Sequence, residues 1–257
     1  PDTLYTVWAN TQAAGKFPRS WSTGNFERGM AYGKVGGKDR IYVVARSGGP
    51  RIDVFDAMTG DSVWTIRPTS SVTGGTFPMN FVDVSDDGVI FVGNLTTDVA
   101  TSAFKIYRWN SEADTALTVI NYTNAGLAGH RLGDVISVFG KASDNTLTIF
   151  AAASGKDKIL KFTTADNGAT FTPAAITISN GTMGSVPNVA LAPDGSLWVK
   201  SYARVLYHYS SSGALIDSVL GAVVGTDGTD IKYFERLGKK YVAVYYPNDA
   251  TPNTDER

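Results

Sequence analysis

The sequence contains no cysteine among its 257 residues, which excludes disulfide bonds, thiolate nucleophiles and cysteine-bound metals. Histidine is nearly absent as well, and neither His130 nor His208 has a metal-ligand partner at a useful spacing. The chain also lacks the nucleophile-elbow, P-loop and dinucleotide-binding patterns of common enzyme classes. The sequence motifs therefore specify no reaction.

Positive and negative residues nearly balance, and the formal net charge is −1 at pH 7. Binding to nucleic acid or to anionic membranes needs clustered Lys and Arg, and the sequence shows no such stripe. Apolar runs are short, and none approaches the ~18 residues that a membrane-spanning helix requires. We therefore expect neither nucleic-acid binding nor membrane insertion.

Short apolar runs joined by Gly- and Asp-containing turns fill the chain instead, and they repeat. The clearest unit, residues 187–220, has four such runs, and similar units cover residues 30–66, 80–120 and 135–178. The first turn of each unit recurs about every 50 residues, and four-stranded propeller blades repeat at about 40–50. These turns lie near Gly37, Gly88, Asn145, Gly195 and Gly238. The pattern predicts an all-β fold, a β-propeller of four-stranded antiparallel blades.

The two ends of the chain bear on how many blades there are. A fifth unit begins at residue 230, runs through residues 241–246 and then stops in a polar tail, residues 247–257, so two of its strands are missing. Residues 4–8 form a separate apolar run, which we expect to be the outer strand of the last blade, closing the ring and covering a sheet edge. Residues 1–257 then form one propeller domain of five blades, with six as the alternative. Its last blade is incomplete in this chain, and we expect the chain to be cut from a longer protein.

Residues 164–171, Thr-Ala-Asp-Asn-Gly-Ala-Thr-Phe, resemble the Asp-box of sialidases and related propellers. In that family the box is a structural turn remote from the active site. We expect Asp166 to accept hydrogen bonds from amides of its own turn, Gly168 to allow a positive φ, and Phe171, after Thr170, to pack on its own blade. The resemblance implies a structural hairpin and not sialidase activity.

Several segments together resemble one family of exported bacterial proteins of unknown function, from about residue 8 to residue 246. The segments are Phe26-Glu-Arg-Gly29, Thr73-Gly-Gly-Thr-Phe-Pro-Met-Asn80, Asp86-Asp-Gly88, Asn94-Leu-Thr-Thr97 and Phe104-Lys-Ile-Tyr-Arg-Trp109. The resemblance implies a propeller fold and a secreted or cell-surface location, and it brings no assigned activity.

Propellers bind ligands at the channel end where the innermost strands begin and the loops converge, and we place the candidate site there. The candidates from strand starts and loops are Glu27, Arg28, Arg46, Asn80, Asn94, Arg131, Asp134, Asn188, Arg204 and Asp230. Trp21 and Phe77, in connections between blades, are candidates for a stacking surface. Converging carboxylate and amide oxygens suit Ca²⁺, with Asp134 and Asp230 as candidate metal ligands.

Two functions from different classes are open at this point. We expect a non-enzymatic binding or scaffolding propeller, part of a larger secreted or cell-surface bacterial protein, with a glycan or another protein as its partner. This interpretation needs no catalytic residue and no cofactor. The alternative is a hydrolase or lyase that depends on a Ca²⁺-type metal at the channel mouth.

Overall fold

The computed structural model of the chain describes residues 6–9 and 26–245, which contain eighteen strands and little helix. The first sheet has β1 (Glu27–Val35), β2 (Lys38–Ala45), β3 (Arg51–Asp56) and β4 (Ser62–Ile66). The second has β5 (Phe77–Val84), β6 (Ile90–Leu95), β7 (Phe104–Trp109) and β8 (Leu117–Tyr122). The third has β9 (Ser137–Phe139), β10 (Thr148–Ala152), β11 (Lys158–Thr163) and β12 (Thr172–Thr177).

The fourth sheet has β13 (Ser185–Leu191), β14 (Leu197–Tyr202), β15 (Leu206–Tyr209) and β16 (Leu215–Val219). A last sheet has only β17 (Ile231–Arg236) and β18 (Lys239–Val244). A 3-10 turn covers Ala125–Leu127, and a single helical turn, α1, covers Gly221–Val224. Among these elements no helix has the length and hydrophobicity to cross a membrane.

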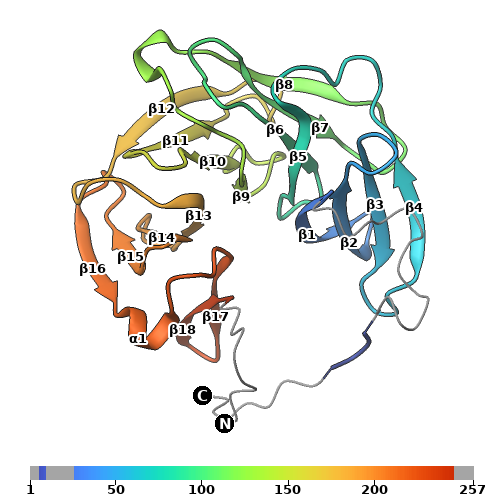
Figure 1. The fold of residues 1–257 in the computed structure, drawn as a ribbon. Coiled ribbons are helices and arrows are strands. Elements are labelled where there is room, and N and C mark those ends of the chain that lie inside the picture. Colours follow the sequence, from blue (N-terminus) through green and yellow to red (C-terminus); the bar gives the residue numbers. More distant parts are fainter. Residues whose placement is uncertain (1–5, 10–25, 246–257) are drawn as a thin grey trace. The chain divides into compact units, whose positions relative to one another are not determined.

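Each four-stranded sheet keeps its strands in chain order, and the paired strands run antiparallel (Figure 1). Consecutive sheets of this kind are the blades of a β-propeller, so the predicted fold class is confirmed. The predicted number of five blades is not shown, because the described residues form four four-stranded sheets and one two-stranded sheet. The predicted polar tail, residues 247–257, lies outside the described residues.

The segment predicted to close the ring is described only in part. Residues 6–9 form no strand, and residues 4 and 5 lie outside the described residues. Trp8 donates its indole N–H to the Ala57 carbonyl at 2.8 Å, in the turn between β3 and β4. Its ring also covers Gly60, where a Cβ would come within 2.6 Å of it. This turn therefore offers the indole both a carbonyl acceptor and a glycine surface, and closure of the ring by residues 4–8 stays a prediction.

The chain divides into two compact units. The first unit comprises residues 1–149 and 162–173, and the second comprises residues 150–161 and 174–257. In the first unit the core lies between the first and second sheets, with Tyr42, Met79 and Trp109 among its fully buried side chains. The sequence therefore buries its largest apolar groups where two sheets face each other.

Glycines in β1 let the first sheet approach the second closely. A Cβ on Gly29 would lie 2.5 Å from the ring of Phe81, and one on Gly33 would overlap Val84. Neither glycine needs a positive φ, so the requirement is space for the neighbouring strand β5.

Aspartates of the second sheet bind backbone amides of the third within the first unit. The Asp83 carboxylate accepts the Val138 amide at 2.7 Å. Asp87, in the turn between β5 and β6, accepts the amides of Ala142 at 3.2 Å and Ser143 at 2.9 Å. Burial would raise the pKa of Asp87, but the hydrogen bonds from the Ser85 hydroxyl and these amides outweigh it and lower the pKa to about 2.

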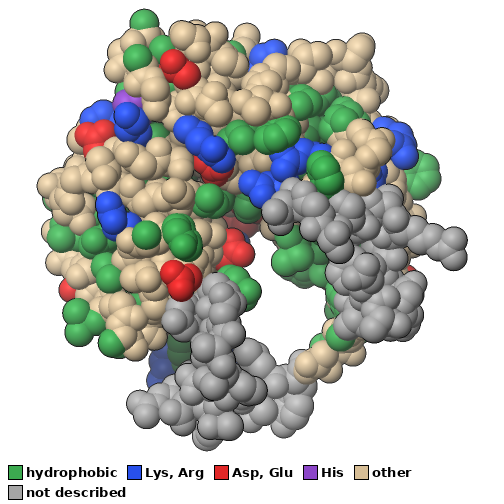
Figure 2. Space-filling view, in the orientation of Figure 1, with side chains coloured by type: hydrophobic (Ala, Val, Ile, Leu, Met, Phe, Trp, Pro, Cys, Tyr) green, Lys and Arg blue, Asp and Glu red, His purple; other side chains and the backbone are tan. Residues whose placement is uncertain are grey.

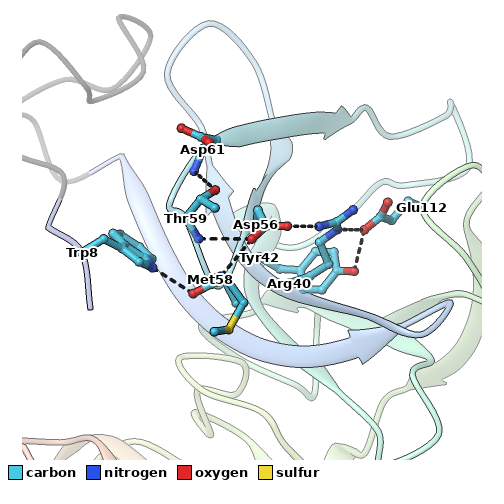
Figure 3. A network of polar contacts seen from close by, with 9 residues as sticks. Trp8, Arg40, Tyr42, Asp56, Met58, Thr59, Asp61 and Glu112 are labelled. Carbon is cyan, nitrogen blue, oxygen red and sulfur yellow. Dashed lines mark hydrogen bonds and ion pairs between the residues drawn. The ribbon is translucent and has the colours of Figure 1, made fainter. Parts of the chain in front are cut away.

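A polar network joins the first sheet to the loop after β7 (Figure 3). The buried Arg40 donates to Asp56 at 2.9 Å and to Glu112 at 3.2 Å, and the Tyr42 hydroxyl donates to the same Glu112 oxygen at 2.9 Å. Burial, followed by the hydrogen bond to Glu112, raises the pKa of Tyr42 far above its usual range. Asp56 also accepts the Met58 amide at 2.9 Å. The network links the first sheet to the loop between β7 and β8 of the second sheet.

In the second unit, a smaller core gathers around Ala190 and Leu206, with Trp198 packed against it. The Trp198 ring stacks on His208 with 4.1 Å between centroids and an angle of 3° between planes. A nitrogen of His208 lies 2.8 Å from the Ser196 hydroxyl, which donates to its own turn. His208 is thus a packed sheet residue.

Candidate functional site

The inner strands of three sheets share an irregularity at their first residues. The register shifts at residues 27–30 of β1, 77–81 of β5 and 185–188 of β13. Bulges re-aim side chains and are common beside binding sites. The predicted site residues Glu27, Asn80 and Asn188 all lie in these segments, so the local backbone gives them directions that regular strands would not.

A cationic and aromatic group forms in the first unit where β1 and β5 begin. The guanidinium carbon of Arg46 lies 3.7 Å from the centre of the Phe77 ring, close enough for a cation–π interaction. The Arg46 amide donates to the Phe26 carbonyl at 3.0 Å, which fixes Arg46 beside the start of β1. Burial and then the charge of Arg28 lower the pKa of Arg46, while Glu27 opposes them. The guanidinium groups of Arg28 and Arg46 and the carboxylate of Glu27 therefore interact electrostatically.

Two side-chain oxygens of β1 and β5 have no donor among the described residues. Asn80 is 1% exposed, and its amide nitrogen donates to the carbonyls of Gly133 at 2.8 Å and Asp134 at 3.3 Å. Its side-chain oxygen, like Oε1 of Glu27, is buried and has no hydrogen-bond partner in the described part of the chain. A buried acceptor left without a donor costs about 1–3 kcal/mol, so these two atoms mark places where a donor would bind.

Asp134, a predicted metal ligand, is engaged by a neighbour. Arg131 donates from Nε to Oδ2 at 2.7 Å and from Nη2 to Oδ1 at 2.5 Å, and the Asp134 side chain is 1% exposed. The hydrogen bond to Asp134 raises the pKa of Arg131. Residues 6–9 and 26–245 contain no group of three or more His, Cys, Asp or Glu that could hold a metal. Ca²⁺ binding stays a prediction. The one sequence feature that could have indicated the Arg131–Asp134 ion pair was its three-residue spacing.

Asn94 does not join the site. Asn94 is fully buried, its oxygen accepts the Lys105 amide at 2.8 Å and its nitrogen donates to the Ala103 carbonyl at 3.0 Å. This amide therefore holds the start of β7 against β6. Trp21 lies outside the described residues.

The second unit holds three further candidates. A hydrogen bond links the side chains of Asn188 and Asp230. Desolvation by surrounding protein raises the pKa of Asp230, and the bond from Asn188 opposes it, while Asp230 as a residue stays exposed. Val186 has a φ of 51°, a strained value for a β-branched residue, in the same bulge as Asn188. Arg204 instead donates to backbone, including the Thr182 carbonyl at 3.3 Å.

Lys200, in β14, is fully buried, and its ammonium group forms hydrogen bonds with backbone carbonyls. It donates to the carbonyls of Ser201 at 3.3 Å, Arg204 at 2.9 Å and Thr226 at 3.2 Å. Burial lowers the pKa of Lys200, and Asp227 opposes this. The lysine ties a loop to the segment before β17 and offers no donor to a ligand.

The Asp166 turn is held by its own hydrogen bonds. The Thr170 hydroxyl donates to Asp166 at 2.6 Å and the Thr170 amide at 2.9 Å, and these bonds lower the pKa of Asp166 to about 2. Gly168 has a φ of 75°. Phe171 lies edge-on to Phe91 of the second sheet at 6.4 Å, whereas the sequence placed it on its own sheet. The resemblance to the Asp-box itself stays a prediction.

The sequence profile of a family described as a domain of unknown function, DUF4623, matches residues 2–254. This chain belongs to the DUF4623 family. No curated protein matches the DUF4623 chain.

Solved structures share the fold of this DUF4623 domain. A DUF4623 family protein from Bacteroides eggerthii has a TM-score of 0.66 at 18% identity, covering 86% of this chain and 50% of that one. This chain thus spans half the length of that relative. A GH43 β-xylosidase/α-arabinofuranosidase from a compost metagenome has a TM-score of 0.52 at 11% identity, with 86% of each chain covered. At these identities the likeness shows the fold alone.

Proposed function

We propose that this DUF4623 domain is a non-enzymatic binding propeller whose partner is a glycan. The binding place is the cluster formed by Glu27, Arg28, Arg46, Phe77 and Asn80 in the first unit. The observations that carry the proposal are the buried acceptor oxygens of Glu27 and Asn80, which lack donors among the described residues, and the Arg46 guanidinium stacked on Phe77.

The chemistry of a sugar matches this set of groups. Each hydroxyl both donates and accepts hydrogen bonds, so it can serve an acceptor oxygen and a guanidinium at once. The C–H faces of sugars stack on aromatic rings, and Phe77 is 36% exposed.

The carboxylates of this cluster are better suited to binding a glycan than to hydrolysing one. Glycoside hydrolysis uses two carboxyl groups, one of which must accept or deliver a proton at the scissile bond. Asp134 has both oxygens bound by Arg131, which leaves Glu27 without a second free carboxylate among the groups that form this cluster. A surface or secreted location and a larger parent assembly belong to the same proposal. The first rests on the family resemblance, and the second is supported by the length of the relative from B. eggerthii.

A metal-dependent hydrolase is the second candidate, and it is supported by the second unit. Asp230 combines a raised carboxyl pKa with a hydrogen bond from Asn188, beside the strained Val186. Perturbed carboxyl groups and strained backbone both concentrate at functional sites.

One pair of measurements separates the two candidates. Affinity electrophoresis in gels containing plant or microbial polysaccharides should retard the wild-type domain, and Phe77→Ala should migrate unretarded. Thermal unfolding in EDTA and then in excess Ca²⁺ should show equal midpoints. A ligand at 1,000 times its Kd stabilises by about 4 kcal/mol, so a Ca²⁺-dependent rise of about 8 °C that Asp230→Ala abolishes would favour the hydrolase instead.

A further inference from the structure

We propose that the turn between β3 and β4 is a binding site for an indole ring, occupied by Trp8 of the same chain, and that Asp56 shapes it. Through this site the first unit holds residues 6–9 on its first sheet. The site shares no residue with the proposed glycan-binding cluster.

The described segment 6–9 is anchored by one side chain. Trp8 is partly buried, whereas Thr6, Val7 and Ala9 are exposed, Val7 to 73%. These four residues form no strand, so no ladder of strand hydrogen bonds fixes them to a neighbour. We therefore infer that binding of the indole positions this segment.

Exposed apolar side chains alone would not define such a site. Figure 2 shows hydrophobic side chains spread over the drawn face among polar ones, and single apolar groups at the surface are ordinary in soluble proteins. Met58, in the same turn, is one of them at 63% exposed. The contact of Trp8 differs because it joins a directed hydrogen bond to a close ring contact.

The turn has two parts that together select an indole. The Ala57 carbonyl accepts the Trp8 N–H at 2.8 Å, and the indole nitrogen can only donate. A Cβ built on Gly60 would lie 2.6 Å from a ring carbon of Trp8, so the ring lies directly against the glycine backbone. Gly60 also has a φ of 76°, which a side chain disfavours. A phenyl ring would lack the donor, and a branched aliphatic chain would lack the flat face.

Asp56 closes this turn with one of its two carboxylate oxygens. Oδ1 accepts the amides of Met58 at 2.9 Å and Thr59 at 3.2 Å, and the Asp56 carbonyl accepts the Gly60 amide at 2.8 Å. The hydrogen bond from the Met58 amide lowers the pKa of Asp56. These bonds fix the backbone that carries both the acceptor and the glycine surface, and Trp8 lies beside this turn in Figure 3.

The other oxygen of Asp56 has a different role. Oδ2 accepts Nη1 of Arg40 at 2.9 Å, and Arg40 binds Glu112 in the loop after β7. Shaping of the turn and pairing with Arg40 are thus divided between two atoms of one carboxylate (Figure 3). An asparagine at position 56 can keep the first role and lose the second.

The test is exchange of the Trp8 indole N–H with water, measured by NMR on the ¹⁵N-labelled chain. The sequence has five tryptophans, and Trp8→Phe identifies the signal of Trp8 among their indole signals. In the wild type we expect this N–H to exchange at least ~10-fold more slowly than that of N-acetyltryptophanamide, because the hydrogen bond protects it. Trp109, fully buried in the core of the first unit, is the folding reference and should stay protected in every variant.

Variants of the turn identify what shapes the site. Asp56→Ala and Gly60→Ala should each remove the protection of Trp8, the first by loosening the turn and the second by placing a methyl group where the ring lies. Asp56→Asn should keep most of the protection, since its side-chain oxygen can still accept both amides. Asp61→Ala is the matched control in the same turn, because the amide of Asp61 donates to the Thr59 hydroxyl and its carbonyl accepts the Asp56 amide.

Each contrary outcome overturns a defined part of the proposal. Exchange of Trp8 in the wild type as fast as in N-acetyltryptophanamide, or full protection in Gly60→Ala, would overturn the indole site. Protection in Asp56→Ala equal to the wild type, or an equal loss in Asp61→Ala, would overturn the role of Asp56. A loss in Asp56→Asn as large as in Asp56→Ala would show that the ion pair with Arg40, not the amide bonds, shapes the turn.

Discussion

Replacing Asp87 with alanine should destabilise the first unit at neutral pH and have little effect near pH 2. The carboxylate accepts the Ser85 hydroxyl at 2.6 Å and the amides of Ser143 at 2.9 Å and Ala142 at 3.2 Å. The last two bonds join the second sheet to the third, so the substitution removes a link between sheets as well as a local turn contact.

The magnitude follows from the pKa. The carboxyl pKa falls from 3.8 to about 2, which corresponds to about 2.4 kcal/mol at 1.36 kcal/mol per unit. Asp87 is exposed, so solvent screening reduces this to about 1–2 kcal/mol. For a chain of this size the unfolding midpoint should then drop by about 2–8 °C. Because the folded-state pKa is depressed, the contribution is fully present above about pH 4 and is lost as the pH falls toward 2.

Urea unfolding of the wild type and Asp87→Ala, followed by tryptophan fluorescence at pH 7, 4 and 2.5, measures this difference. Asp86→Ala is the matched control, because Asp86 contacts the Gly140 carbonyl through its backbone amide, at 2.9 Å. The reasoning is refuted if the two variants are equally stable at pH 7, or if the loss in Asp87→Ala persists undiminished at pH 2.5.

Three further substitutions test the packing. Gly29→Ala should cost about 1–3 kcal/mol in urea unfolding, since the new methyl group would overlap Phe81, including its backbone; a neutral result would show that β1 can shift. Phe162→Ala should cost about 3–5 kcal/mol by the same assay, because the ring is 1% exposed and packs on Phe104 at 5.9 Å. Lys200→Met should lower the unfolding midpoint by an amount equivalent to about 1–3 kcal/mol, because three backbone carbonyls lose their donor; an unchanged midpoint would contradict the role given to the ammonium.

The repeating strands could be predicted because their signals are local. In the fourth sheet, the four apolar runs expected within residues 187–220 correspond to β13–β16. Alternating apolar residues and Asp-Gly turns act over a few positions, so one strand can be read without knowing its neighbours. The number of complete blades was harder to predict from the sequence. The last sheet has only β17 and β18, and the strand pattern does not show which other segments would pair with them.

The sequence predicted which residues form the candidate site, but it did not predict which of their side chains contact one another. Arg46 and Phe77 were both assigned to the same end of the strands, but their stacking depends on how β1 and β5 pack and where each strand bulges. Asp134 was read as a metal ligand because a carboxylate at a strand start suits that role, whereas Arg131 three residues earlier takes both oxygens. Such choices between partners are decided by three-dimensional distances that spacing along the chain does not encode.

The aspartates that join the second sheet to the third also limit how this domain can be rearranged by gene duplication. Asp83 and Asp87 recognise amides at fixed positions of the following sheet, so the two sheets match each other by position as well as by apolar surface. A copied sheet inserted between them would need a turn with the same acidic spacing and a successor with amides in the same places. Exchanging either sheet alone would therefore lose these hydrogen bonds unless the acidic positions and the matching amides were both kept.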